Sequence, residues 1–127
     1  MREEQRNILV VDDIGEYAMV MEIYFPDNTR LISAATTEKA KSAFAANKID
    51  LAIVDVRLNE KAVSDSSGME LLSWIRQNHA DTPVIMISAY MGSEYEMEAL
   101  ERGAHCFLRK PLQPEHIRRA LQGVFDA

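Results

Sequence analysis

Polar side chains that could do chemistry stand at the ends of short apolar runs. They are Asp12 and Asp13 after residues 8–11, Asp55 after residues 51–54, Ser88 after residues 84–87, and Lys110 shortly after residues 104–108. Short apolar runs bounded by polar residues predict strands buried on both faces, as in parallel sheets covered by helices. Ligands of such open sheets sit outside the carboxyl ends of the strands. We therefore expect these side chains to meet in one cleft.

The predicted cleft is acidic and contains one ammonium group. Three carboxylates in one place repel one another, so the site would favour a hard divalent cation. Mg²⁺ suits it, because this ion takes one or two carboxylates, keeps several waters and completes its shell with phosphoryl oxygens. The Lys110 ammonium would act as a point charge on a phosphoryl oxygen, and the Ser88 hydroxyl would donate to another. These parts predict phosphoryl transfer onto an aspartate.

Segments with helical periodicity separate the apolar runs. Their apolar residues recur at spacings of three and four, which is the period of an amphipathic helix. The expected strands cover residues 8–11, 31–35, 51–55, 84–87 and 104–108. The expected helices cover residues 16–25, 69–78, 93–100 and 114–124, and a further helix, the second in chain order, includes residues 40–44. Strands that alternate with helices imply βαβ crossovers, hence an open parallel sheet with helices on both faces.

Residues that favour helix ends agree with this division. Thr36 or Thr37 can cap the second helix, and Ser93 with Glu96 has the spacing of a capping box for the fourth. Gly103 can end that helix in the left-handed conformation. Proline is preferred at the first position of a helix, which predicts that the last helix begins at residue 114.

Length and composition bound the class of protein. We expect residues 1–127 to form one domain, with 47% hydrophobic and 27% charged residues as in globular proteins. The net charge of −6 disfavours direct nucleic acid binding. The single cysteine, Cys106, cannot form an internal disulfide. No apolar run approaches membrane-spanning length or follows a basic signal-peptide start, so we expect a cytoplasmic location without membrane attachment.

Several motifs together point to a known family. They are residues 10–13 (VVDD), 54–55 (VD), 68–72 (GMELL), 87–89 (ISA), and 103–104 (GA) with 107–111 (FLRKP). Taken together they resemble the receiver domain of two-component response regulators, over nearly the whole chain. The resemblance implies a flavodoxin-like, doubly wound α/β fold, with a five-stranded parallel sheet in the order 2-1-3-4-5 and five helices.

The resemblance also implies roles for the acidic residues. Asp55 would accept a phosphoryl group from a phosphohistidine of a sensor histidine kinase or phosphotransfer protein. Asp13 and Asp55 would bind Mg²⁺ directly, together with the backbone carbonyl of Arg57, while Asp12 would act largely through water. Such a protein is not a conventional enzyme, because it catalyses only its own phosphorylation and dephosphorylation.

The remaining site residues would form the switch of that family. Ser88 would move toward the new phosphoryl group and Phe107 would rotate into the space it vacates. A cis peptide bond between Lys110 and Pro111 would aim the ammonium into the cleft. The switch would change the surface of the fourth helix, fifth strand and fifth helix, where a downstream protein target or output domain docks and where a homodimer could form.

This chain departs from the family pattern after the phosphoacceptor. Asp55 and Gly68 are thirteen positions apart, so the polar loop over residues 57–67 is about five residues longer than usual. Asn59 stands where a proline is common, and Phe107 replaces the commoner tyrosine. Without a hydroxyl, Phe107 can switch only by packing.

Two positions beside the predicted cleft are expected to tune the lifetime of the phosphorylated state. Arg57 and Tyr90 each stand two residues beyond a site residue, Asp55 and Ser88 respectively. Side chains there would screen the water that attacks the acyl phosphate. Replacing either by alanine should therefore change the rate of autodephosphorylation.

Two other functions remain open on the sequence. An aspartyl-phosphate hydrolase of the haloacid dehalogenase type also uses an aspartate after an apolar strand, but it needs a second aspartate where Arg57 stands. A pseudo-receiver would be a fixed interaction module that never cycles phosphate. The full acidic set with Ser88 and Lys110 argues against a pseudo-receiver, whereas absence of Mg²⁺ binding would favour one.

Overall fold

A five-stranded parallel sheet forms the centre of the protein. The structure is a computed structural model and describes residues 5–13, 15–58, 67–89 and 93–125. The strands are β1 (Arg6–Val11), β2 (Thr29–Ala34), β3 (Leu51–Asp55), β4 (Val84–Ser88) and β5 (Cys106–Arg109), in the order β2-β1-β3-β4-β5. The predicted flavodoxin-like α/β fold and strand order are confirmed.

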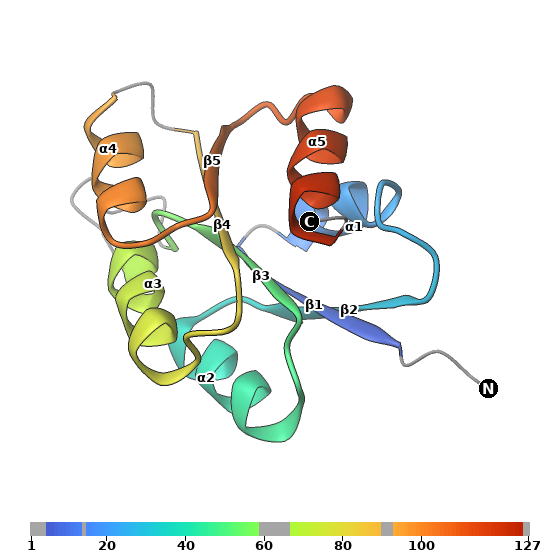
Figure 1. Ribbon diagram of the computed structural model, residues 1–127, viewed down its shortest axis with the longest axis horizontal. Helices are drawn as coiled ribbons and strands as arrows, with labels where there is room; N and C mark the ends of the chain where they lie inside the picture. Colours follow the sequence, from blue (N-terminus) through green and yellow to red (C-terminus); the bar gives the residue numbers. More distant parts are fainter. Residues whose placement is uncertain (1–4, 14, 59–66, 90–92, 126–127) are drawn as a thin grey trace.

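Five helices cover the two faces of this sheet. They are α1 (Gly15–Glu22), α2 (Thr37–Ala46), α3 (Ser67–Asn78), α4 (Glu94–Glu101) and α5 (Pro114–Phe125). Figure 1 shows α1 and α5 on one face and α2, α3 and α4 on the other. The arrangement is the doubly wound one, because the crossover helix before β2 (α1) and the crossover helices after it (α2, α3 and α4) lie on opposite faces.

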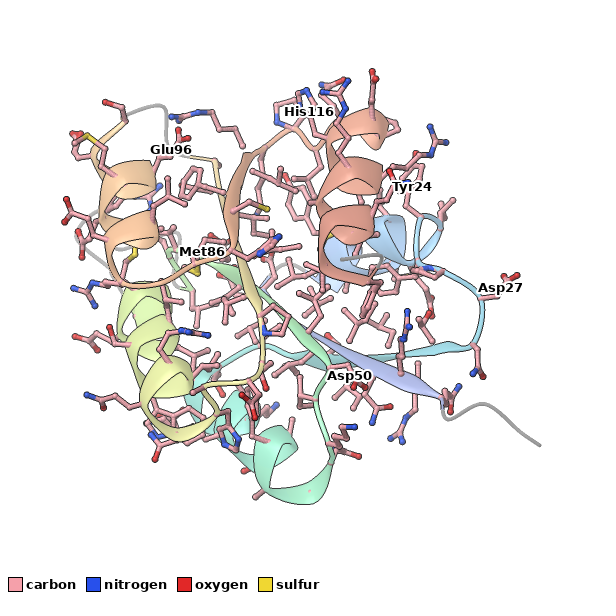
Figure 2. The ribbon with its side chains drawn as sticks, in the orientation of Figure 1. Tyr24, Asp27, Asp50, Met86, Glu96 and His116 are labelled. Carbon is pink, nitrogen blue, oxygen red and sulfur yellow. The ribbon has the colours of Figure 1, made fainter. Side chains whose placement is uncertain are left out.

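The core consists of two apolar layers separated by the sheet. Side chains of a strand alternate between its faces, so Leu9 and Val11 pack toward α2, α3 and α4, whereas Ile8 and Val10 pack toward α1 and α5. Every residue of β3 and β4 is buried. Figure 2 shows Met86 of β4 inside the molecule. These two central strands therefore present Asp55 and Ser88 from fixed backbone positions.

Three of the predicted helix ends are confirmed. The side chain of Thr36 accepts a hydrogen bond from the Lys39 backbone N–H at 3.2 Å, which caps α2. Gly103 has a φ of 103°, the left-handed conformation expected after α4. Helix α5 begins at Pro114. Local chemistry thus determines where these helices begin and end.

The predicted capping box of Ser93 and Glu96 is wrong. Ser93 has helical backbone angles, φ −82° and ψ −13°, and makes no side-chain capping bond. A capping side chain needs an extended backbone to reach the first N–H groups of the helix. Glu96 instead forms an ion pair with Arg109 of β5, whose Nη2 lies 3.0 Å from Glu96 Oε1.

The edge strands and the long loop show the limits of the predicted boundaries. Strand β2 begins two residues before the predicted start, and β5 two residues after it. Both are edge strands, and neither is buried on both faces, so their sequence signal is weaker. Most of the predicted 57–67 loop lies outside the described residues, and so does Tyr90.

Candidate functional site

The predicted site residues gather at the carboxyl ends of neighbouring strands. Asp12 follows β1, Asp55 ends β3, Ser88 ends β4, and Lys110 follows β5; all four are buried. The pairing β1–β3–β4–β5 brings these strand ends side by side. The site lies at the point where the strand order reverses, which is where open α/β sheets bind ligands.

The Lys110 ammonium connects two of the acidic residues. Its Nζ lies 2.8 Å from Asp55 Oδ2 and 3.0 Å from Asp12 Oδ2. All three side chains are at most 4% exposed. The Lys110–Pro111 peptide bond is cis, and the Lys110 backbone N–H donates to the carbonyl of Ser88 at 2.8 Å. The backbone of Lys110 is therefore hydrogen-bonded to the end of β4, and its side chain enters the site from there.

The three predicted carboxylates form one cluster. Oxygens of Asp12, Asp13 and Asp55 lie within 4.8 Å of one another, with Asp13 exposed and the other two buried. Asp55 Oδ1 accepts a hydrogen bond from the Arg57 backbone N–H at 3.1 Å. Hard oxygen donors at this spacing, with one of them open to solvent, fit a divalent cation such as Mg²⁺.

The electrostatics of the cluster favour added positive charge. Burial raises the pKa of Asp55 from 3.8 to about 6; Lys110 and the Arg57 N–H oppose that rise, and the charge of Asp12 adds to it. Burial acts to lower the pKa of Lys110, but its bonds to Asp55 and Asp12 outweigh that effect and raise it. The lysine therefore stays charged, and its single charge leaves the carboxylates under-compensated.

Neutralising Asp55 should stabilise the metal-free protein. The pKa of the Asp55 carboxyl group is higher in the folded protein than in the unfolded chain, so the protonated form favours folding. The folded protein is therefore destabilised as pH rises from about 4 through 6 and this carboxyl group loses its proton. The shift from 3.8 to about 6 corresponds to at most about 3 kcal/mol. In urea titrations with EDTA, the free energy of unfolding of Asp55→Asn should exceed that of the wild type by up to that amount at pH 8 and by much less at pH 4. An equal gain at both pH values would contradict this account.

Sequence reasoning missed one residue of the site. The ring centroid of Tyr17, on α1, lies 3.8 Å from Lys110 Nζ. Tyr17 is one of the apolar residues that recur at spacings of three and four in the predicted helix 16–25, which indicates only a packing role, and it does pack against the α1 and α5 side of the core. Its place in the first turn after Asp13 was the available signal. Phe107 by contrast lies outside the acidic cluster and packs, half-buried, against the α2–α4 side of the core.

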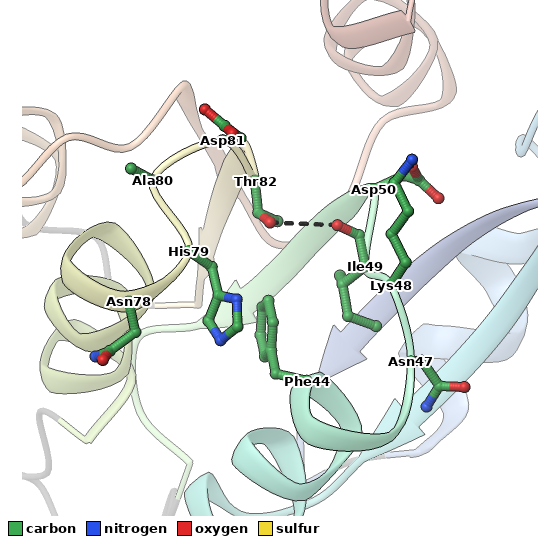
Figure 3. A pocket seen from close by; sticks show the side chains of 10 residues that line it. All are labelled: Phe44, Asn47, Lys48, Ile49, Asp50, Asn78, His79, Ala80, Asp81 and Thr82. Atoms are coloured by element: carbon green, nitrogen blue, oxygen red, sulfur yellow. Dashed lines mark hydrogen bonds and ion pairs between the residues drawn. The ribbon is translucent and has the colours of Figure 1, made fainter.

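A cleft away from the site is lined by residues of a different kind. It has a volume of about 560 Å³ and is lined by the loops before β3 and β4 (Figure 3). Phe44 stacks on His79 with 4.4 Å between ring centroids, and the Thr82 hydroxyl donates to the carbonyl of Ile49 at 3.2 Å. These loops precede the strands, so the cleft lies at the opposite edge of the sheet from Asp55.

Comparisons of the sequence agree with this geometry. The sequence model of the response regulator receiver domain matches residues 8–122. Response regulator protein PilR of Pseudomonas aeruginosa is 34% identical over 117 residues, which are 90% of this chain and 25% of that protein. Nitrogen assimilation regulatory protein NtrX of Azorhizobium caulinodans is 30% identical over 112 residues, which are 87% of this chain and 24% of that protein. The chain thus spans about a quarter of the length of these relatives.

Solved structures show the same fold. The receiver domain of NtrX from Brucella abortus is 28% identical with a TM-score of 0.77, covering 91% of this chain and 98% of that chain. A response regulator from Thermotoga maritima has a TM-score of 0.83 at 22% identity, covering 97% of this chain and 99% of that chain. Among the described residues, each helix is too short or too polar to cross a membrane.

Proposed function

Because this chain belongs to the response regulator receiver domain family, we propose that it is a switch in which Asp55 accepts a phosphoryl group. The donor would be a phosphohistidine of a sensor histidine kinase or phosphotransfer protein. The observation that carries the proposal is the Lys110 ammonium, buried between Asp55 and Asp12 beside a third carboxylate. A buried lysine in this position can bind a phosphoryl oxygen as readily as a carboxylate oxygen.

The proposed transfer is a displacement at phosphorus. A carboxylate oxygen of Asp55 forms the new P–O bond while the P–N bond to the donor imidazole breaks, and the imidazole leaves with the bonding electron pair. The two Asp55 oxygens are oriented beforehand, because Oδ2 bonds to Lys110 and Oδ1 accepts from the Arg57 N–H. Catalysis of this kind is mostly positioning and charge neutralisation.

The residues divide the charge of the transferred group between them. Lys110 would bind one phosphoryl oxygen and the Ser88 hydroxyl would donate to another. Asp13 and Asp55 would hold Mg²⁺ with the Arg57 carbonyl, and Asp12 would hold it through water. Bound there, Mg²⁺ would neutralise phosphoryl oxygens and thereby lower the repulsion that the carboxylates present to the incoming group.

The output of the switch would be a change of surface. Phe107 lies on β5 two residues before Arg109, whose side chain bridges to α4, so an inward rotation of Phe107 would alter the α4–β5–α5 face. A protein target or an output domain would dock there, or a second copy would form a homodimer. We propose that the protein acts in the cytoplasm through protein contacts, without binding nucleic acid directly.

A small phosphodonor tests the proposed function. Incubation with Mg²⁺ and acetyl phosphate should add one phosphoryl group per chain, measured by intact mass, and EDTA should suppress the labelling. Mg²⁺ binding without labelling would favour a pseudo-receiver instead. Steady turnover of a phosphomonoester would favour the hydrolase of the haloacid dehalogenase type.

The lifetime of the phosphorylated state is proposed to depend on Arg57. Its backbone N–H holds Asp55 and its side chain is only partly buried, so the guanidinium can cover the path of the attacking water. Arg57→Ala should change the autodephosphorylation rate severalfold, and Arg30→Ala, an exposed change on edge strand β2, should not. The same measurement on Tyr90→Ala tests the second predicted position. Equal rates in all variants would remove both residues from this role.

A further inference from the structure

The aromatic ring of Tyr17 faces the charged end of Lys110. The ammonium nitrogen lies 3.8 Å from the ring centroid, well inside the range of a cation–π interaction. Tyr17 stands in the first turn of α1 and is held there by apolar neighbours on the α1 and α5 side of the core. The ring is therefore a fixed part of the wall beside the acidic cluster.

A ring face suits this position better than another acidic group would. The cluster already holds the carboxylates of Asp12, Asp13 and Asp55. A further carboxylate near Lys110 would add negative charge where a phosphoryl group must enter. An aromatic face attracts the ammonium through its quadrupole but carries no net charge. It also covers the ammonium with apolar surface, which strengthens its remaining electrostatic contacts.

We propose that Tyr17 is a positioning residue for phosphoryl transfer, holding the Lys110 ammonium against its ring face and shielding it from water. The proposal rests on the proposed function and adds a residue to it. During transfer the ammonium exchanges a carboxylate oxygen of Asp55 for a phosphoryl oxygen. The ring contact does not depend on either oxygen, so it persists while the other partner changes. Tyr17 thereby keeps the ammonium aligned before the phosphoryl group arrives.

Substitutions at Tyr17 separate an electrostatic role from simple space filling. Phenylalanine keeps the ring face and removes only the hydroxyl, whereas leucine keeps apolar volume without a ring. Tyr17→Phe should be labelled by acetyl phosphate at close to the wild-type rate. Tyr17→Leu should be labelled about threefold to thirtyfold more slowly, the range from an exposed to a desolvated cation–π contact. Urea titrations identify a variant that is not folded, and Tyr17→Met then replaces leucine as the ringless variant.

Tyr24→Leu is the matched control. The Tyr24 ring, which follows the end of α1 (Figure 2), also faces a cation, with Cζ of Arg118 within α5 5.2 Å from its centroid, but this pair does not include Lys110 or the acidic residues. The labelling rate of Tyr24→Leu should equal that of the wild type. A general loss of packing on this side of the sheet would slow Tyr17→Leu and Tyr24→Leu alike, which would overturn a specific role for Tyr17.

A spectroscopic measurement tests the contact without any phosphoryl transfer. Protons on the Lys110 carbon next to the ammonium should be shifted upfield in the NMR spectrum by the ring current of Tyr17. The upfield shift should persist in Tyr17→Phe and disappear in Tyr17→Leu. The proposal would be overturned if the Lys110 signals of Tyr17→Leu matched those of the wild type, or if the two proteins were labelled at equal rates. An unlabelled wild type would instead overturn the proposed function, whatever the NMR spectrum shows.

Discussion

Asp55→Asn is expected to abolish phosphorylation of this protein. The asparagine amide keeps the shape of the side chain and can still accept a hydrogen bond from Lys110, but it cannot act as the nucleophile. Loss of a covalent nucleophile lowers the rate by at least about a thousandfold. Intact mass spectrometry after incubation with Mg²⁺ and acetyl phosphate should therefore show only unmodified protein.

The control for this variant is an aspartate at the other end of the same strand. Asp50 precedes β3, and one of its carboxylate oxygens accepts a hydrogen bond from the Asn7 backbone N–H at 2.8 Å. Asp50→Asn removes the same charge at the opposite edge of the sheet, where the cleft of Figure 3 lies. It should be labelled like the wild type. Full labelling of Asp55→Asn would show that another residue accepts the phosphoryl group.

The site could be predicted because it depends on topology more than on side-chain detail. Asp12, Asp55 and Ser88 each end a short apolar run, and parallel strands place such ends at one edge of the sheet. Lys110 follows the last strand in the same way. Once the alternation of strands and helices is recognised, these residues must approach one another, whatever the exact strand boundaries.

Contacts that depend on side-chain rotamers could not be predicted in the same way. Tyr17 looks like an ordinary apolar residue of an amphipathic helix, and its partner Lys110 lies almost at the other end of the chain. Glu96 has the spacing of a capping box, yet its carboxylate pairs with Arg109. Each contact joins two different elements, α1 with the residue after β5 in one case and α4 with β5 in the other, so the periodicity within a single helix or strand does not predict it.

Gly68→Ala is expected to destabilise the protein strongly, for a reason that lies in the same site. Gly68 is the second residue of α3, and its N–H donates to the Val56 carbonyl at 2.9 Å. A Cβ added there would overlap the Asp55 carbonyl oxygen and lie 2.7 Å from the carbonyl oxygen of Val56. These are backbone atoms of the β3 end, which cannot rotate away. The helix would have to move from the sheet, at a cost of about 3 kcal/mol or more.

Gly123→Ala tests whether the close approach, rather than the loss of a helical glycine, determines the result. A Cβ at Gly123 on α5 would meet only His105 Nε2, at an ordinary contact distance of 3.5 Å. Alanine should therefore stabilise α5 by about 0.5–1 kcal/mol, because glycine is the poorer helix former. Urea unfolding of both variants should give opposite signs. A Gly68→Ala protein within about 0.5 kcal/mol of wild type would mean that α3 and the end of β3 can move apart at little cost, and their contact would then not hold Asp55 in place.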